Sequence, residues 1–110
     1  MSGWKDALDN TLPPLVVGCT NCGGMNTHQR RVIVHFRDHE DGAGRAVTVV
    51  DGNPLVEVRR LASDSAEFEG RRDDVIVELE CESCQATTAI RIMQHKGETQ
   101  FSYLKNEGAA

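Results

Sequence analysis

The chain of 110 residues carries a formal net charge of −5 and four cysteines, and only 5% of its residues are aromatic. This length fits one domain with a thin core, and the acidic balance argues against loose, sequence-independent binding to nucleic acid, which relies on Lys and Arg. Neither an apolar run of about 18 residues nor a basic stretch followed by an apolar block is present. We therefore expect a soluble, cytoplasmic protein without membrane association.

The first part of the chain, residues 1–14, is expected to form an N-terminal arm. Ser2 is placed to cap a helical turn that carries Trp4, Ala7 and Leu8 on one side. The two prolines at 13 and 14 end that turn, because proline removes a backbone donor and clashes with the preceding turn.

A single domain is expected to span 15–104, followed by a polar C-terminal tail at 105–110. Apolar residues predict strands at 15–17, 31–37, 46–50, 56–58, 74–81, 87–95 and 100–104. Polar residues and glycines at 38–44 predict a hairpin between the second and third of these strands. The stretch 59–74 is rich in Ser, Asp, Glu, Gly and Arg and is expected to be an exposed loop.

The clearest strand is 74–81, where Val75, Val77, Leu79 and Cys81 alternate with more polar positions. Such alternation is typical of a strand with one buried face, and this strand delivers Cys81 from its end. In the strand at 87–95, Ile90 and Ile92 are expected to point inward. The pattern predicts a mostly β fold, an antiparallel sheet of about five or six strands with an inserted hairpin and little helix.

The four cysteines fall as two pairs, each with two residues inside it: Cys19 and Cys22, then Cys81 and Cys84. This spacing lets both sulfurs of a pair reach one tetrahedral ion, so we predict a structural Zn²⁺ bound by all four thiolates. The pairs are further apart than in common motifs, but the longer loop costs only about 1 kcal/mol. A structural zinc site can contribute roughly 10 to 16 kcal/mol, which outweighs that cost.

Other interpretations of these residues remain open. The cysteines could be free and buried or form a redox pair, although a redox pair normally opens a helix and both pairs here are bounded by strand patterns. His28 could replace one cysteine as a ligand. His39 lies among acidic residues, but without the spacing of a calcium loop.

The pair Cys19 and Cys22 with Gly23 behind it, followed by strands and then a strand that runs into Cys81 and Cys84, resembles a zinc ribbon. Residues 71–99 are also similar to small zinc-ribbon proteins of unassigned function encoded by bacteriophages and their bacterial hosts. The resemblance implies two knuckles that clamp one zinc at the end of an antiparallel sheet, and it brings no catalytic residue with it.

A site closed by four sulfurs has no open metal position, and the sequence offers no obvious nucleophile and base. We therefore expect a non-enzymatic module that docks on another protein within a larger assembly, such as a transcription complex or a virus particle. If the chain is phage-encoded, its location is the host cytoplasm or the virion.

A nucleic-acid-binding ribbon is the main alternative function. In either case Arg37, Arg91 and Lys96 are the candidate partner-binding residues, because their charges can contact phosphate or an acidic protein surface. A self-associating structural protein stapled by zinc is a third alternative, and the oligomeric state is left open.

Overall fold

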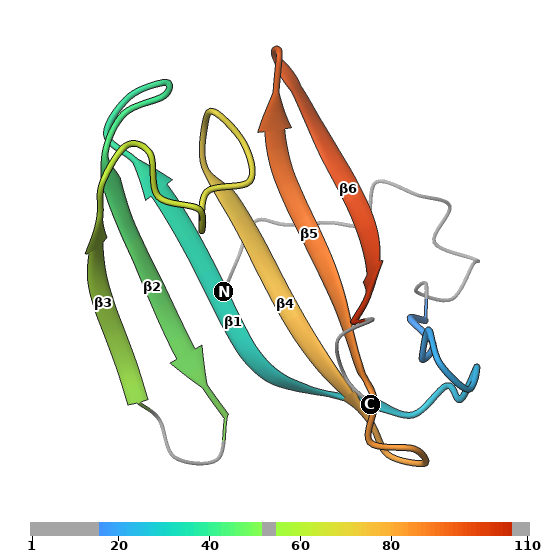
Figure 1. The fold of residues 1–110 in the computed structure, drawn as a ribbon. Coiled ribbons are helices and arrows are strands. Elements are labelled where there is room, and N and C mark those ends of the chain that lie inside the picture. The colour runs from blue at the N-terminus through green and yellow to red at the C-terminus, as the bar shows by residue number, and fades with distance from the viewer. Residues whose placement is uncertain (1–15, 52–54, 107–110) are drawn as a thin grey trace, which may run out of the picture.

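The computed structural model describes residues 16–51 and 55–106. One sheet contains six antiparallel strands in the order β3-β2-β1-β4-β5-β6 (Figure 1). The strands are β1 (Thr27–Arg37), β2 (Gly44–Val50), β3 (Leu55–Leu61), β4 (Asp74–Cys81), β5 (Thr87–His95) and β6 (Glu98–Lys105). Because the described ranges contain no helix, the expected mostly β sheet is confirmed.

The sheet consists of two three-stranded meanders, β1-β2-β3 and β4-β5-β6, joined through the antiparallel pair β1 and β4. In that pair Thr27 lies opposite Cys81 and His35 lies opposite Asp74. The first cysteine pair precedes β1, and the second begins at the end of β4. This register therefore brings two distant parts of the sequence to the same end of the sheet.

Strand β1 begins at Thr27, earlier than the predicted start at residue 31. Its register against β4 shifts between Gln29 and Arg31, and this bulge interrupts the alternation on which the prediction relied. The strand predicted at 15–17 is wrong for Val16 and Val17, which lie outside the sheet in the segment that leads to Cys19. The N-terminal arm at 1–14 lies outside the described residues.

The loop between β3 and β4 is shorter than the predicted 59–74. Strand β3 continues to Leu61 and β4 begins at Asp74, so the connection spans residues 62–73. Leu61 and Asp74 are both buried. At the C-terminal end, β6 continues to Lys105, one residue into the predicted tail.

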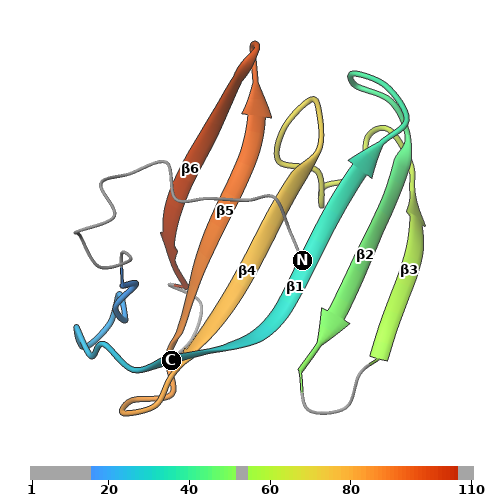
Figure 2. The same cartoon turned by 180° about the vertical axis from the view of Figure 1, so that it is seen from behind.

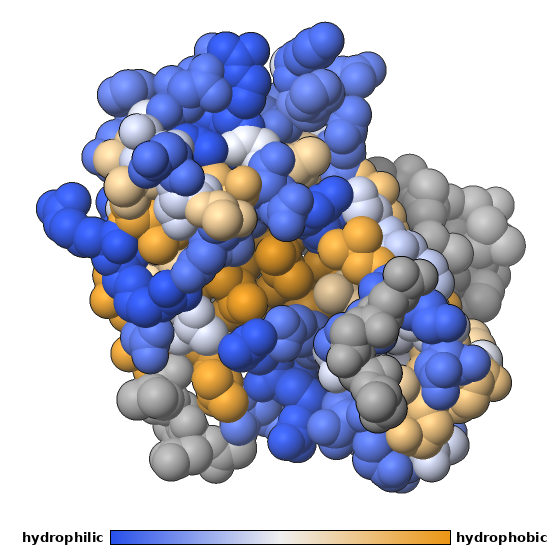
Figure 3. Space-filling model, viewed as in Figure 1, coloured by the Kyte–Doolittle hydropathy of each residue, from blue (hydrophilic) through white to orange (hydrophobic). Residues whose placement is uncertain are grey.

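One face of the sheet is partly covered by this loop, and we call it the loop face. In Figure 1 the loop passes in front of the strands, and Figure 3 shows a hydrophobic centre on this side surrounded by hydrophilic surface. The central strands place the following residues on the loop face: Ile33, His35, Ala46, Thr48, Asp74, Ile76, Ala89, Arg91 and Met93. Ala46, His35 and Asp74 are among its buried side chains.

The opposite face is turned toward the viewer in Figure 2. Because most of the residues that the strands place on it are apolar, we call it the apolar face. Strand pairing places on it Val32, Val34, Phe36, Val47, Val49, Val56, Val58, Val75, Val77, Leu79, Ile90, Ile92, Phe101 and Tyr103. Ile92 was expected to point inward, but 42% of it is exposed. The sheet is a single layer, and within the described ranges no second layer packs on this face.

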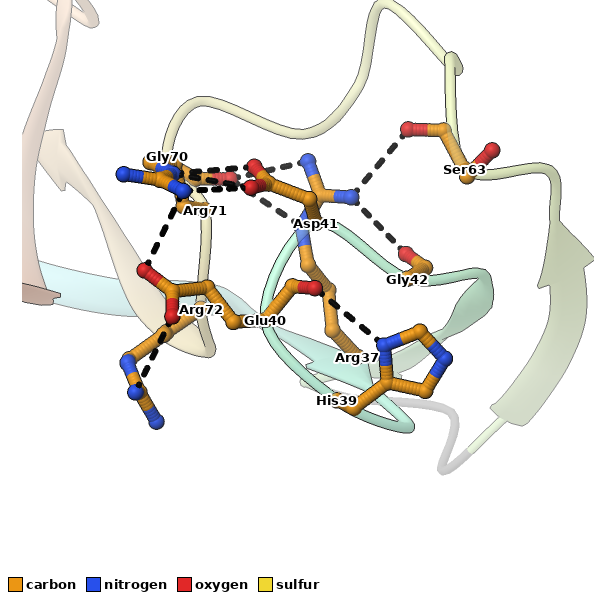
Figure 4. Close-up of polar contacts among 9 residues, drawn as sticks. All are labelled: Arg37, His39, Glu40, Asp41, Gly42, Ser63, Gly70, Arg71 and Arg72. Carbon is orange, nitrogen blue, oxygen red and sulfur yellow. Dashed lines mark hydrogen bonds and ion pairs between the residues drawn. The ribbon is translucent and has the colours of Figure 1, made fainter.

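Arg37 fastens the loop to the sheet (Figure 4). Its guanidinium donates hydrogen bonds to the carbonyl oxygens of Gly70 at 2.9 and 3.0 Å, Gly42 at 2.8 Å and Ser63 at 3.1 Å. It also lies 3.8 Å from the centroid of the Phe68 ring. One side chain thereby satisfies backbone acceptors from two loops, which only the planar, multi-donor guanidinium can do.

A buried polar pair lies close to Arg37. His35 and Asp74 face each other across β1 and β4, with Nδ1 and Oδ1 2.6 Å apart, and both side chains are nearly inaccessible to water. The rings of His35 and Phe68, which belongs to the loop, form a T-shaped contact with centroids 6.2 Å apart. Because buried polar groups must find partners, this contact favours one register of β1 against β4.

Among the described residues, no helix is long and apolar enough to cross a membrane.

Replacing Arg37 with Lys is expected to destabilise the fold by about 2 kcal/mol, because an ammonium cannot satisfy the three carbonyl groups together and leaves some of them unpaired. Urea unfolding of the zinc-loaded protein measures the change. Arg72→Lys is the matched control, since Arg72 is exposed and, among the residues that the structure describes, makes one ion pair, at 3.4 Å, to Glu40. Equal stability of the two variants would contradict the structural role of Arg37.

Candidate metal centre

The structure brings the four predicted cysteines together at one end of the sheet. Their sulfur atoms all lie within 4.8 Å of one another. The closest sulfurs come from different pairs: Cys19 and Cys84 are 3.6 Å apart, and so are Cys22 and Cys81. Cys19 and Cys81 are buried, Cys84 is half-buried and Cys22 is exposed, so the cluster lies at the surface with its inner half shielded.

These distances fit a shared tetrahedral ion. Zinc binds thiolates at about 2.3 Å, and a regular tetrahedron of that size has sulfurs about 3.8 Å apart. A disulfide would need about 2.05 Å, so the sulfurs are too far apart to be bonded to each other. Four cysteines therefore form a site that can hold one metal ion, and an all-sulfur, tetrahedral arrangement favours Zn²⁺ among the common ions.

Both cysteine pairs lie on turns of the same backbone geometry. In the first turn Cys19 N donates to Gly24 O at 2.7 Å, and Gly23 N donates to Cys19 O at 3.0 Å. In the second, Cys81 N donates to Ala86 O and Gln85 N donates to Cys81 O, both at 3.0 Å. The two halves of the centre are thus equivalent, although one precedes β1 and the other connects β4 to β5.

The equivalence extends to one residue with a left-handed backbone. Gly23 has φ +78°, and Gln85, at the corresponding place in the second turn, has φ 62°. Glycine adopts this conformation cheaply, whereas a residue with a side chain is strained by roughly 1 kcal/mol or more. The absence of glycine after Cys84 therefore does not change the shape of the second turn.

Backbone N–H groups point at the sulfurs, as a metal–thiolate site requires. Asn21 N lies 3.3 Å from the Cys19 sulfur, and Gly24 N lies 3.4 Å from the Cys22 sulfur. The Asn21 side chain also donates to the Cys84 sulfur at 3.5 Å, across the two turns. Such outer contacts orient the ligands and stabilise their negative charge.

Thr88 supports the site from within the sheet, and sequence reasoning missed it. Its hydroxyl accepts a hydrogen bond from Thr20 N at 3.0 Å and lies 2.9 Å from the Thr20 hydroxyl. Thr88 is almost fully buried in β5. Its hydrogen bonds to Thr20 therefore hold the first cysteine turn against this strand. A threonine in a strand is ordinary, and only the pairing of distant segments reveals this contact.

The thiols do not ionise alike in the metal-free chain. Hydrogen bonds from the backbone of Cys22 and, less strongly, Asn21 lower the pKa of Cys19 to about 6 despite its burial. The Asn21 side chain, followed by the backbone of Ala86, lowers the pKa of Cys84. The Gly24 backbone lowers the pKa of Cys22, but Cys81 and Cys84 outweigh it and raise that pKa to about 11. Four crowded thiolates thus need a cation before all of them ionise.

The remaining predicted site residues lie away from the cluster. His28 pairs with Glu82 at 3.5 Å and takes no part in the sulfur cluster. Arg37 and Arg91 lie on the loop face of β1 and β5 with β4 between them, and Arg91 is 3.5 Å from Glu69. Lys96 is exposed in the turn between β5 and β6. The structure does not gather these three cations into one patch.

Replacing Cys22 with Ser is expected to weaken Zn²⁺ affinity by more than the 10- to 100-fold typical of losing an outer contact, because a ligand itself is lost. Chelator competition on the purified protein measures the affinity, and elemental analysis the stoichiometry, expected to be one zinc per chain. Ser83→Ala in the other turn is the control and should bind normally. A Cys22→Ser protein with unchanged affinity would disprove the four-thiolate site.

The matched backbone positions allow a second test. Gly23→Ala should destabilise the zinc-loaded protein by about 1 kcal/mol, since a Cβ there meets no atom within 4 Å and the cost is conformational only. Gln85→Gly should stabilise the zinc-loaded protein by up to about 0.5 kcal/mol. The relief of backbone strain at this position slightly exceeds the entropy cost of introducing a glycine. Thermal unfolding at fixed zinc concentration measures both. Changes of the same sign would show that the two turns are not equivalent.

No family model, no curated protein and no solved structure matches this chain. The assignment of a metal centre therefore rests on the spacing of the cysteines and on the geometry of the site.

Proposed function

We propose that this protein is a non-enzymatic, zinc-binding module that docks on another protein within a larger assembly. The resemblance of its two knuckles to zinc ribbons suggests a transcription complex or a virus particle as that assembly. The observation that carries the proposal is the apolar face, because the described part of the chain leaves most of it without a covering layer.

The metal centre supports a structural role for the ion. Four thiolates fill the coordination sphere of zinc and leave no position for water or substrate. The ion would tie the start of β1 to the turn after β4 and so hold the two meanders together. Zinc in this position stabilises a surface rather than performing chemistry.

The side of the apolar face formed by β2 and β3 is suited to bind a protein. Val56 and Val58 on the edge strand are 59% and 60% exposed, and Val49 beside them is 43% exposed. Contiguous exposed apolar side chains of this kind mark interaction sites in soluble proteins. We call this region, Val49, Val56, Val58 and the arginines described next, the β2–β3 patch.

Two arginines beside these valines indicate which kind of protein surface the patch would bind. Arg45 and Arg60 lie directly opposite each other on β2 and β3, on the apolar face. Like charges at such positions repel. Arg45 lies 3.8 Å from Asp38, whereas Arg60 has no ion pair within the described residues. A partner with apolar side chains and carboxylates would cover the valines and neutralise this pair.

The arginines that would serve nucleic-acid binding are engaged elsewhere. Arg37 is committed to loop carbonyl groups, and Arg91 is mostly buried beside Glu69. Phosphate binding needs several available cations on one surface, so this arrangement favours a protein partner over nucleic acid.

Quantitative affinity capture from cells of the source organism tests the proposal. The unmodified protein should recover a specific partner, and the double variant Val56→Asp with Val58→Asp should lose at least about ten-fold of it, because desolvating two carboxylates in an apolar contact is costly. Glu57→Gln is the control, as Glu57 lies between these valines on the opposite face. Arg60→Glu should also lower recovery if the partner carries carboxylates.

Two outcomes would contradict the proposal. One is equal recovery with the double variant and the control, which would place docking elsewhere. The other is recovery of nucleic acid alone, with an affinity that falls steeply as salt increases.

A further inference from the structure

We propose that a second copy of this chain pairs antiparallel with the free edge of β6, so that two sheets join into one continuous sheet in a two-fold symmetric dimer. Strands β6 and β3 are the two edges of the sheet (Figure 1). The dimer would use the β6 edge and leave the β2–β3 patch at the far edge free. The inference concerns a different surface from the proposed docking site and does not depend on it.

The hairpin between β5 and β6 determines which backbone groups of β6 are free. Its turn consists of Lys96 and Gly97, with φ 50° and 81°, and two residues of positive φ are typical of the tight turn of a hairpin. The residues on either side of such a turn, here His95 and Glu98, form a hydrogen-bonded pair. Hydrogen-bonded pairs then alternate with non-bonded ones along the antiparallel ladder.

The backbone of β6 therefore faces β5 at every second residue. The bond from Gln94 N to Asp73 O, at 3.4 Å on the other side of β5, agrees with this alternation. The N–H and C=O groups directed away from β5 belong to the residues on the apolar face: Thr99, Phe101, Tyr103 and Lys105. Within the described residues these groups have no backbone partner, so they form a row that another strand can bind.

Strand β6 lacks the features that normally protect an edge strand, which are charged side chains, proline and bulges. The other edge strand, β3, carries Glu57, Arg59 and Arg60 within its seven residues. Residues 99–104 of β6 contain neither a charged residue nor a proline, and their pairing with β5 has no shift of register. Of the two edges, β6 is therefore the one suited to pair with a strand.

The charges of β6 favour a second copy as that strand. The strand begins with Glu98 and ends with Lys105. In an antiparallel pair related by a two-fold axis, the Glu98 end of each copy lies beside the Lys105 end of the other, so opposite charges are close together at both ends. A parallel arrangement would bring like charges together.

The side chains of β6 also fit this symmetry. Outward-facing residues must pair with outward-facing residues, and a register with the axis at Ser102 places Phe101 opposite Tyr103 of the second copy, on both sides of the axis. Phe101 is 65% and Tyr103 50% exposed in one chain, so the aromatic pairs would remove apolar surface from water. The Tyr103 hydroxyl donates to the Gly18 carbonyl, which already positions its ring.

Sedimentation of the zinc-loaded full-length protein over a concentration series tests the dimer. The mass should rise from that of one chain to that of two and then stay constant. Ser102→Glu should raise the dimer dissociation constant at least about ten-fold, because two carboxylates would face each other across the axis. Within one chain that carboxylate lies opposite Arg91, which favours folding. Ser102→Gln, of equal size and without charge, is the matched control and should dimerise normally.

Two further variants separate the interface from the stability of the chain. Ser102→Glu mixed with Ser102→Lys should form a mixed dimer, because opposite charges then meet at the axis. Thr99→Pro removes an N–H that points away from β5, so it should weaken the dimer and leave the β5–β6 ladder intact. Zinc content and circular dichroism check that each variant is folded.

The proposal is overturned if the protein stays monomeric throughout the series, if its mass grows beyond two chains, or if Ser102→Glu and Ser102→Gln dimerise equally. The double variant Val56→Asp with Val58→Asp should still dimerise, and Ser102→Glu should still capture the protein partner. Loss of the dimer and loss of docking are therefore separate results.

Discussion

The antiparallel pairing of β1 with β4 is the constraint on which the rest of the structure depends. It joins two local meanders, and its register sets Thr27 opposite Cys81, which places the first cysteine turn beside the second. Without this pair the sulfurs would belong to separate sheets. An ion bound by both turns in return restrains the β1–β4 register, since a shift of one residue would move Cys81 to the other face. Sheet pairing and an ion held by the four cysteines would therefore stabilise the same contact.

Few elements cover the sheet, so its side chains are poorly buried. The restraint on the β1–β4 register is therefore important for the stability of the fold. A twelve-residue loop covers part of one face, held by Arg37, and the buried His35–Asp74 pair replaces apolar packing near the centre. On the other face the described residues leave large apolar side chains in contact with water. A domain of this size with one layer gains less from burial than a sandwich does, so a metal ion held by the four cysteines would supply stability that a second layer would otherwise provide.

Local features were predictable from the sequence, whereas long-range ones were not. Alternation identified β4 and the faces of its residues correctly, because a strand has a strict period of two. Cysteine spacing identified the four sulfurs that the fold gathers. The bulge near Arg30 hid the start of β1, since it breaks that period. Which strand pairs with which, and hence the support of Thr20 by Thr88, depends on contacts between distant segments that no local pattern encodes. The exposure of Ile92 was likewise not predictable. The alternation along β5 indicated the face on which Ile92 lies, but not whether another segment covers that face.

The distribution of charge over the two faces links the fold to its proposed use. The strands place Glu57, Asp74, Glu78, Glu80 and Glu98 on the loop face, while Arg45, Arg60 and Lys105 lie on the apolar face. A molecule with a net charge of −5 thus presents its least acidic surface where it is also most apolar. Long-range repulsion by the whole molecule disfavours polyanions such as nucleic acid, because few cations are available to offset it. At short range, the same face would attract a carboxylate that arrives on an apolar segment, because Arg60 has no ion pair within the described residues and Arg45 has only a long one, at 3.8 Å, to Asp38. Under the proposed function, this face would therefore suit an amphipathic, moderately acidic protein surface better than a free polyanion.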